Sequence, residues 1–318
     1  MRHATGSLDT PMTILVCGEA LFDLFQSDGD ATGEITFAAK MGGSPFNVAI
    51  GISRLGGTAA LLTGISHDTL GERLVEKLRE ETVDTSFLIH NGRRTTLSVV
   101  GLDAAGHPSY AFYGAGSADC SLTVDDLPEL GPEIAALHFG SYSIAVPPVA
   151  DAFAELATRY AGRFISLDPN IRPTVEADMT VWRQRIDRLR ANVNMIKVSA
   201  EDLKTLFPGA LPLDIAGQWV SDGAELVVVT DGGNPAHVVR SDEVFQVAPL
   251  PVAVVDTVGA GDAFQACLLA GLQSRGTMAV NRRALPRDDL RDLIERASRA
   301  AGVACSRQGA DLARTGEV

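Results

Sequence analysis

The sequence is poor in the residues that would build a disulfide framework, a structural zinc site or a basic surface. It has four cysteines in 318 residues, and none belongs to a C-x-x-C pair. Isolated cysteines of this kind argue against a disulfide scaffold and are typical of reduced thiols in a cytoplasm. Lysine and arginine number 27 against 40 acidic residues, so the formal net charge is −13. That balance argues against broad binding to nucleic acid and against general adhesion to anionic membranes.

Long hydrophobic runs are also missing. No window approaches the ~18–20 apolar residues of a membrane span, and residues 1–11 lack the apolar core of a signal peptide. We therefore expect residues 1–11 to form a loose tail on a soluble, cytoplasmic protein. Hydrophobic residues make up 46% of the chain and charged residues 21%, which is ordinary for a globular protein.

Short apolar runs alternate with segments of helical spacing along most of the chain. The apolar runs are residues 14–17, 135–139, 164–167, 195–198 and 226–230, and the helical segments are 44–55, 69–81, 148–160, 182–191, 200–207 and 215–221. This alternation predicts an α/β fold with a doubly wound, mostly parallel sheet covered by helices on both faces. Polar and glycine residues follow every apolar run, which predicts a ligand cleft beyond the carboxyl ends of the strands.

Two stretches break this rhythm. Residues 34–41 and 95–113 are richer in Thr, Ser, Phe and Tyr, and turn-forming residues accompany them. They predict antiparallel strands in a small second sheet. We expect a single domain over residues 12–318, with a β lid formed by about residues 30–41 and 94–115.

The strongest motif is Asp256-Thr257-Val258-Gly259-Ala260-Gly261-Asp262-Ala263-Phe264, which leads into an almost wholly apolar helix. Gly259 and Gly261 allow close approach of the backbone to a ligand, and the free amides of a helix start suit a phosphate or an oxyanion. Asp262 has two interpretations, a plain helix N-cap or a base beside a transferring phosphoryl group. The chain has no G-x-x-x-x-G-K-[ST], G-x-G-x-x-G, H-E-x-x-H or G-x-S-x-G motif, which weakens P-loop, dehydrogenase, zinc hydrolase and esterase functions.

The second motif is Met41-Gly42-Gly43-Ser44-Pro45-Phe46-Asn47-Val48-Ala49. We predict Ser44 as the N-cap of a helix and Pro45 as its first residue. Asn47 offers both a donor and an acceptor, which is what sugar hydroxyls require of an amide partner. The alternative is a capped helix start with an exposed asparagine.

Together the two motifs resemble the signatures of the ribokinase-like, or PfkB, family of sugar kinases, and the resemblance spans residues 14–310. It implies a three-layer α/β domain with a β-sheet lid. Asp262 would be the general base, taking a proton from a primary hydroxyl of the sugar as that oxygen attacks the γ-phosphorus of ATP. The amides of Gly259, Ala260 and Gly261 would form the anion hole. Phosphoryl transfer depends mainly on such alignment and charge stabilisation.

The resemblance also implies which residues contact the sugar. They are Asp23, Gly43, Asn47, Phe112, Asn170 and Arg172. Phe112 would cover the sugar and exclude water, or else belong to the lid core. Arg172 would face the sugar or the transferred phosphate, or else form a surface ion pair that contributes little.

For ATP, the resemblance implies contacts from Lys197, Ser199, Thr230, Gly232, Gly261 and Gly309. The family segment that places Mg²⁺ through waters has Asn and Glu where this chain has Ser199 and Asp202, so Glu201 could share the metal role with Asp202. The alternative is an ordinary acidic first turn of a helix. The resemblance further allows a monovalent cation such as K⁺ near residues 256–257 and 306–309.

Within the family, the segments around Gly18, Gly42 and His138 look like bacterial fructokinases. Ketodeoxygluconate kinases are the nearest alternative, but they carry a lid arginine where this chain has Gly114. A substrate carboxylate would be left with Arg172 as one candidate partner and Arg93 or Arg94 as distant ones, which makes its burial costly. Fructose is therefore preferred over ketodeoxygluconate, and ribose and adenosine fit less well. A non-catalytic sugar- or nucleotide-binding regulator is the alternative of another class. Lid strands in the family commonly pair between subunits, which implies a homodimer.

Overall fold

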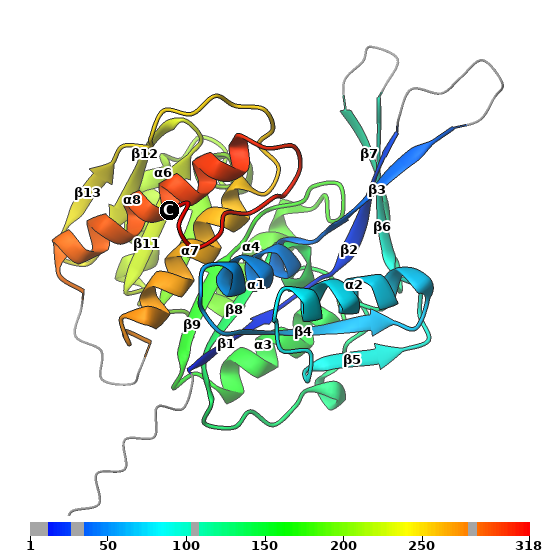
Figure 1. The fold of residues 1–318 in the computed structure, drawn as a ribbon. Coiled ribbons are helices and arrows are strands. Elements are labelled where there is room, and N and C mark those ends of the chain that lie inside the picture. The colour runs from blue at the N-terminus through cyan, green and yellow to red at the C-terminus, as the bar shows by residue number, and fades with distance from the viewer. Residues whose placement is uncertain (1–11, 27–34, 103–107, 279–284) are drawn as a thin grey trace, which may run out of the picture.

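The structure is a computed structural model that describes residues 12–26, 35–102, 108–278 and 285–318 (Figure 1). The expected tail at residues 1–11 lies outside the described residues. So do residues 30–34 and 103–107 of the expected lid.

The described residues form a large sheet of nine strands with the order β13-β12-β11-β10-β9-β8-β1-β4-β5. All strands from β11 to β5 pair in parallel, whereas β12 and β13 extend the sheet in antiparallel fashion. This confirms the predicted doubly wound, mostly parallel sheet. The strands are β1 (Thr13–Cys17), β4 (Ala59–Ser66), β5 (Leu88–Asn91), β8 (Ile134–Gly140), β9 (Phe164–Asp168), β10 (Met195–Ser199), β11 (Leu226–Asp231), β12 (Asn234–Val239) and β13 (Val244–Val247).

Helices cover both faces of this sheet (Figure 1). They are α1 (Ser44–Arg54), α2 (Thr69–Glu80), α3 (Val149–Arg159), α4 (Met179–Arg190), α5 (Ala200–Leu206), α6 (Pro212–Ser221), α7 (Ala260–Ser274) and α8 (Arg287–Cys305), with short 3₁₀ turns η1 (Val124–Asp126) and η2 (Ser141–Ile144). The central strand β1 divides the hydrophobic core. Ile14 and Val16 pack with α1, α2, α7 and α8, whereas Leu15 and Cys17 pack with α3 to α6. A strand buried on both faces has to be apolar throughout, as residues 14–17 are.

A separate sheet of four strands has the order β3-β2-β6-β7. Its strands are β2 (Leu21–Gln26), β3 (Phe37–Gly42), β6 (Thr96–Leu102) and β7 (Pro108–Tyr113), and they project from one end of the larger sheet (Figure 1). The sequence analysis assigned no strand to residues 21–26, which form β2. Asp23 lies on β2, which pairs antiparallel with β3 and parallel with β6.

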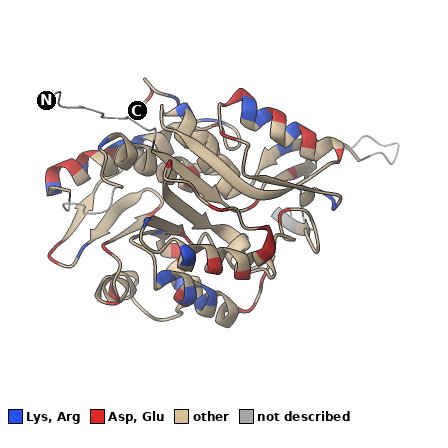
Figure 2. Cartoon of the chain, turned by 90° about the horizontal axis from the view of Figure 1, so that it is seen from below, with Lys and Arg blue, Asp and Glu red and all other residues tan. Residues whose placement is uncertain are grey.

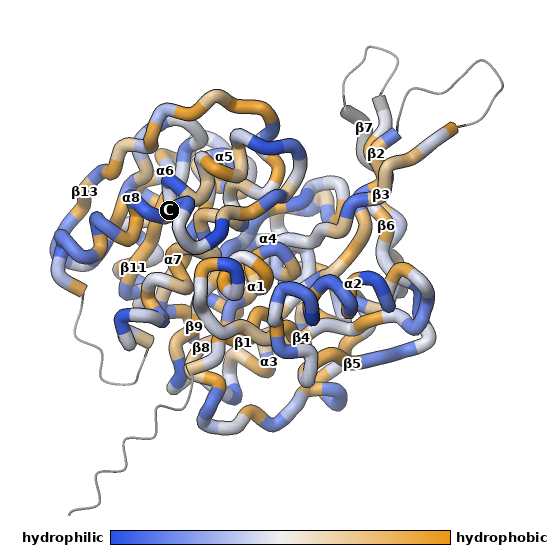
Figure 3. The backbone as a smooth tube through the Cα atoms, in the orientation of Figure 1, coloured by the Kyte–Doolittle hydropathy of each residue, from blue (hydrophilic) through white to orange (hydrophobic). Residues whose placement is uncertain are grey.

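Several outer helices carry charges of both signs. In Figure 2, basic and acidic residues are interspersed along them, and Arg185 and Arg188 of α4 both contact Asp151 of α3. Hydrophilic and hydrophobic turns alternate along α2 and α8 in Figure 3, which is typical of helices with one face on the core. Among the described residues, no helix combines the length and the apolar character needed to cross a membrane.

Candidate active site

A cavity of about 500 Å³ lies between the small sheet and the carboxyl ends of the parallel strands. Residues that follow β1, β8 and β9 line it, together with residues of β2, β6 and β7 and the starts of α1 and α7. Its location agrees with the cleft expected from the polar residues at the strand ends. The ends of β10 and β11 contribute no lining residue among those described.

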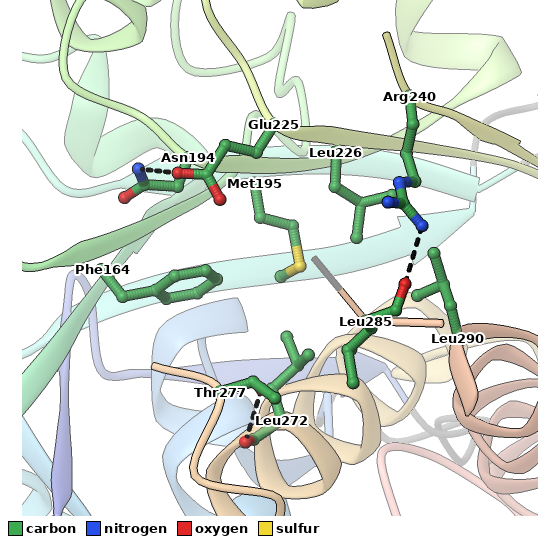
Figure 4. A pocket seen from close by; sticks show the side chains of 10 residues that line it. All are labelled: Phe164, Asn194, Met195, Glu225, Leu226, Arg240, Leu272, Thr277, Leu285 and Leu290. Carbon is green, nitrogen blue, oxygen red and sulfur yellow. Dashed lines mark hydrogen bonds between the residues drawn. The ribbon is translucent and has the colours of Figure 1, made fainter. Parts of the chain in front are cut away.

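A second, smaller cavity lies at the opposite end of the strands (Figure 4). Its volume of about 80 Å³ leaves room for only a few water molecules. Apolar side chains such as Met195 and Leu272 line it, and Arg240 donates a hydrogen bond of 2.9 Å to the carbonyl of Leu285 at its edge. No sequence-predicted site residue is among the described residues that line this cavity.

Asp262 lies in the first turn of α7 at the wall of the larger cavity. The N-cap of α7 is Gly259, which adopts a left-handed conformation with φ 79°, so the interpretation of Asp262 as an N-cap was wrong. The carboxylate is buried and faces α1. Its Oδ1 accepts a hydrogen bond of 2.7 Å from the Ser44 hydroxyl, and its Oδ2 accepts one of 2.8 Å from the Asn47 amide. These two contacts fix the direction of the carboxylate.

The start of α1 differs from the expected one. Gly43, not Ser44, is the N-cap, and its φ of 105° favours glycine. A Cβ at Gly43 would also lie 2.6 Å from the carbonyl oxygen of Glu19. Because Ser44 is not the cap, its hydroxyl is free to donate to Asp262. Asn47 is buried, so the alternative of an exposed asparagine was wrong as well.

The backbone at Gly259, Ala260 and Gly261 turns into α7 beside Asp262. The first amides of a helix have no intrahelical partner and carry partial positive charge. One of the three predicted anion-hole amides is engaged, since the Ala260 N–H donates to the carbonyl of Thr257 at 3.3 Å. A Cβ at Gly261 would lie 3.0 Å from Nζ of Lys197. The helix start therefore combines unpaired amides with an adjacent ammonium group.

Lys197 comes from β10 and forms a buried ion pair with Asp168 at the end of β9, with Nζ 2.8 Å from Oδ2. Burial raises the pKa of Asp168 to about 6, against the effect of the nearby ammonium. Burial opposes the charge on Lys197, but Asp168 raises the pKa of that ammonium above its usual value. Lys197 thus carries a positive charge next to Gly261, and its ion pair with Asp168 fixes the position of the ammonium group.

The structure brings all six predicted sugar-binding residues to the larger cavity. They are Asp23, Gly43, Asn47, Phe112, Asn170 and Arg172. Arg172 donates a hydrogen bond of 2.7 Å to the Asn170 side chain, so it is held at the cavity instead of forming a surface ion pair. The ring of Phe112 packs edge-on against Tyr142, with 4.9 Å between ring centroids. Burial raises the pKa of Asp23, which Ser98 and Arg172 partly oppose.

Of the residues predicted to contact ATP, four lie on or just after β10 and β11, whereas Gly261 lies in α7 and Gly309 follows α8. Ser199 is the N-cap of α5 and accepts a hydrogen bond of 2.9 Å from the amide of Asp202. Asp202 in turn accepts one of 3.0 Å from the amide of Ile171, whereas Glu201 is exposed. Thr230 pairs with Ser199 across the two strands, and Gly232 follows in the turn to β12 with φ 54°.

These contacts agree with the alternative that residues 199–202 are an ordinary helix start. Among the described residues, no group of three or more His, Cys, Asp or Glu side chains could hold a metal ion. Mg²⁺ favours oxygen ligands, retains waters and commonly binds through substrate phosphates. A site with one or two carboxylates lies outside that count, so the metal role of Asp202 and Glu201 stays a prediction.

The two segments expected near a monovalent cation are adjacent. The amides of Val255 and Asp256 donate to the carbonyl of Cys305, and Gly309 donates to Oδ2 of Asp256 at 2.8 Å. Although burial opposes it, the amides of Val258 and Gly309 lower the pKa of Asp256, and the charge of Lys40 adds to the effect. Lys40 belongs to β3, and its Nζ would lie 3.0 Å from a Cβ at Gly309.

Three further cavity residues follow predicted strands and so belong to the cleft expected from the sequence, which gave none of them a role of its own. They are Glu19, Ser141 and Tyr142. Sequence reasoning missed Ser98, which carries no comparable signal because it reaches the cavity only through the pairing of β6 with β2.

Comparisons with known proteins agree with this arrangement. A fructokinase of Rhizobium leguminosarum bv. trifolii is 42% identical over 261 residues, which are 82% of this chain and 79% of that protein. A Xylella fastidiosa fructokinase with bound ATP superimposes with a TM-score of 0.84 at 26% identity, over 94% of both chains. A Vibrio cholerae O395 fructokinase in a fructose-, ADP- and calcium-bound form gives a TM-score of 0.81 at 27% identity, over 95% of both chains.

The family assignment follows from the length of the match. Residues 13–315 match the pfkB family of carbohydrate kinases, which is nearly the whole chain. Both signature motifs lie within the match, and the larger cavity lies between them in space. The chain belongs to the pfkB family of carbohydrate kinases and is a phosphotransferase with an alcohol group as acceptor.

Proposed function

We propose that this protein is an ATP-dependent fructokinase that transfers the γ-phosphoryl group of ATP to a primary hydroxyl of fructose, forming fructose 6-phosphate. One observation carries the proposal: Asp262 lies at the wall of a polar cavity of about 500 Å³, directly beside the glycine-rich start of α7. The fructokinases of Rhizobium and Vibrio described above support fructose as the acceptor.

In this mechanism Asp262 takes the proton of the attacking hydroxyl. Ser44 and Asn47 each donate to one of its carboxylate oxygens, so the base is oriented before the sugar binds. The amides of Gly259 and Gly261 and the ammonium of Lys197 stabilise charge on the phosphoryl oxygens. The oriented Asp262 supplies alignment, and the amides with Lys197 supply electrostatic stabilisation. Phosphoryl transfer requires both.

The charges around the cavity favour a neutral sugar. Of the described lining residues, Arg172 alone is basic, whereas Glu19, Asp23 and Asp262 are acidic. The carboxylate of ketodeoxygluconate would meet this excess of negative charge with little compensation. Arg93 is not a partner for a substrate carboxylate, since its guanidinium donates a hydrogen bond of 3.3 Å to the carbonyl of Gly116.

The nucleotide is proposed to lie beyond Lys197, along Ser199, Thr230, Gly232 and Gly309. Mg²⁺ would bind through the ATP phosphates, with Asp202 and Glu201 contributing through bridging waters. K⁺ would bind between residues 256–257 and 306–309, where Asp256 supplies a carboxylate.

The edges of the small sheet favour a homodimer. Phe37 on β3 and Tyr113 on β7 are 40% and 65% exposed, on the two outer strands of that sheet. Unpaired strand edges with exposed apolar side chains invite pairing with a second copy. We propose that lid strands pair in this way, that residues 12–318 form one domain, and that the enzyme is cytoplasmic. Light scattering on the purified protein would test the dimer.

ADP release with a panel of acceptors tests the function. We expect turnover with fructose to exceed turnover with ketodeoxygluconate, ribose and adenosine. A protein that binds sugar and ATP but releases no ADP would be a regulator and would contradict the proposal. Faster turnover with ketodeoxygluconate than with fructose would support the kinase activity but show that fructose is not the preferred substrate.

A further inference from the structure

Gln265 is a buried amide on the helix that carries the catalytic base, and the mechanism above gives it no role. It lies in α7, three residues after Asp262, and is 0% exposed. The other residues of the segment 263–272 are Ala, Phe, Cys, Leu and Gly. Such residues suit a core, whereas a buried amide is tolerated only where it finds hydrogen-bond partners. The partners of Gln265 therefore indicate why a polar side chain occupies this position.

These partners come from two neighbouring strands of the larger sheet. Nε2 of Gln265 donates a hydrogen bond of 2.8 Å to the Ser166 hydroxyl on β9 and lies 3.4 Å from Nδ1 of His138 on β8. His138 and Ser166 are register partners, and Nδ1 and the hydroxyl oxygen are 3.2 Å apart. Both side chains are buried. We call these three side chains the His138–Ser166–Gln265 network.

The network is electrically neutral. Burial lowers the pKa of His138 to about 3, the positive charge of Lys197 adds to the effect, and a backbone hydrogen bond at Ser166 opposes it. A neutral imidazole accepts a hydrogen bond at its unprotonated nitrogen, and both the Ser166 hydroxyl and the Gln265 amide are placed to donate to Nδ1. The network therefore joins α7 to β8 and β9 without placing a charge in the core.

The network lies beneath the catalytic groups and apart from the substrate. None of its three residues is among the described residues that line the larger cavity. Ser166 precedes Asp168 by two residues on β9, so both side chains lie on the face of the sheet that α7 covers. Asp168 in turn binds Lys197 next to Gly261. The first turns of α7 thus rest on two successive polar layers, the network and the Asp168–Lys197 ion pair.

Stability alone does not explain the glutamine. Its Oε1 is buried, and no described residue donates a hydrogen bond to it. An unpaired buried oxygen costs free energy that an apolar side chain of similar size would not. Hydrogen bonds supply direction, which non-directional apolar contacts do not. An amide bound to Ser166 therefore restricts the rotation and height of α7 on the sheet more narrowly than apolar packing does.

We propose that Gln265 is a positioning residue that fixes α7 on the sheet and so aligns Asp262 and the first amides of the helix with the substrates. Its contacts with Ser166 and His138 are the means. The inference rests on the proposed function, in which those groups of α7 act in phosphoryl transfer. The reaction tolerates little misalignment, since a displacement of about 1 Å can cost about 100-fold in rate.

The experiment compares Gln265→Met with wild type. Methionine keeps the length of the side chain but cannot donate to Ser166, and Ser166 can still donate to His138. We expect kcat with fructose to fall by about 10- to 100-fold, with the KM values for fructose and ATP within about twofold of wild type. The thermal unfolding temperature should stay the same or rise, because the unpaired buried oxygen is removed. Amide hydrogen exchange at residues 260–263 should become faster.

Gln273→Met is the matched control, because it makes the same change near the other end of the same helix. The Gln273 side chain accepts from the amide of Thr58 at 3.0 Å and donates to the carbonyls of Met12 and Thr58 at 2.5 and 2.9 Å. It is not among the described residues of the larger cavity. Gln273→Met should lower the unfolding temperature and keep kcat within about twofold of wild type. The two variants should therefore show opposite patterns of activity and stability.

Ser166→Ala tests the same contact from the strand. It should lower kcat by a similar factor with both KM values unchanged. The double variant with Gln265→Met should be no slower than the slower single variant, because all three lack the same hydrogen bond. If Gln265→Met does not fold, the kcat and KM values of Ser166→Ala decide the question.

A kcat within about twofold of wild type in Gln265→Met, or in Ser166→Ala alone where Gln265→Met does not fold, would overturn the inference. An equal loss of kcat in Gln273→Met would overturn it too, because any weakening of α7 would then slow the reaction. A fall of the unfolding temperature together with kcat in both network variants would assign the network a structural role and also overturn it. A wild type that releases no ADP with any sugar would refute the proposed function instead. Hydrogen exchange needs no turnover, so unchanged exchange at residues 260–263 in both network variants would still count against the network.

Discussion

The substitution Asp262→Asn separates the chemistry of the site from its stability. In the native structure the carboxylate accepts one hydrogen bond from Ser44 and one from Asn47, at 2.7 and 2.8 Å. An asparagine can accept from Asn47 through its oxygen and donate to the Ser44 hydroxyl through its amide. Both contacts survive, and we expect the free energy of unfolding to change by less than about 1 kcal/mol.

Catalysis should respond differently, because the amide of asparagine cannot take a proton from the attacking hydroxyl. Loss of a general base costs ~10²–10⁴-fold in rate, so kcat should fall by that factor. The KM for fructose should change little. The assay is coupled ADP release at saturating fructose and ATP, with thermal unfolding followed by circular dichroism on the same preparation.

Asp68→Asn provides the control for removing a carboxylate with good hydrogen bonds. Asp68 is the N-cap of α2, accepts from the amides of Gly71 and Thr95, and is not among the described residues of the cavity. It should lose about 1 kcal/mol of stability and keep kcat within about threefold of wild type. A kcat of Asp262→Asn that also stays within about threefold of wild type would refute the assignment of the base.

Three further outcomes concern the scaffold of the site. Gly43→Ala should cost at least about 1–3 kcal/mol in chemical denaturation, because its φ of 105° and the 2.6 Å approach to the Glu19 carbonyl exclude a Cβ; an unchanged midpoint would contradict this. Lys197→Met should destabilise by about 3–5 kcal/mol, because it leaves Asp168 charged and buried without its partner. A double variant with Asp168→Leu should recover part of that loss. Arg54 lowers the pKa of Glu81 to about 2 from its usual 4.5, so about 3 kcal/mol of stability should be present above pH 4.5 and be lost as the pH falls toward 2. Urea midpoints between pH 2 and pH 6 would measure it, and Glu81→Gln should flatten the curve.

The larger sheet was predictable because its signals are local. The run at residues 164–167 is apolar except for Ser166, and it became β9 with every residue buried. The helical spacing at residues 69–81 became α2 and ends at Glu80. The sequence analysis did not identify β4, although all of its residues are buried. Because it contains Ala, Thr and Gly, this run is less hydrophobic than the neighbouring strands and is harder to recognise in the sequence. It is nevertheless buried, because the surrounding elements cover it.

The lid was predicted only in part, because the sequence of a strand does not specify which other strand it pairs with. Residues 21–25 show no regular alternation of apolar and polar side chains, and only pairing with β3 and β6 makes β2 an inner strand of the small sheet. The same holds for Ser44. A serine before Pro45 is typical of a helix cap, but the left-handed Gly43 takes that place in the structure.

The sequence by itself determined the chemistry available at the site. The glycines at 259 and 261, the acid at 262 and the asparagine at 47 identify a sugar kinase from short motifs, since a motif preserves residue type and spacing. Tertiary structure decided which of these groups act on one another. Asp262 meets Ser44 and Asn47 across 218 and 215 residues of sequence. Contacts of that separation depend on how α1 and α7 pack. Short-range pattern encodes conformation and burial, whereas the direction of a side chain in a site is set by the packing of elements far apart in the chain.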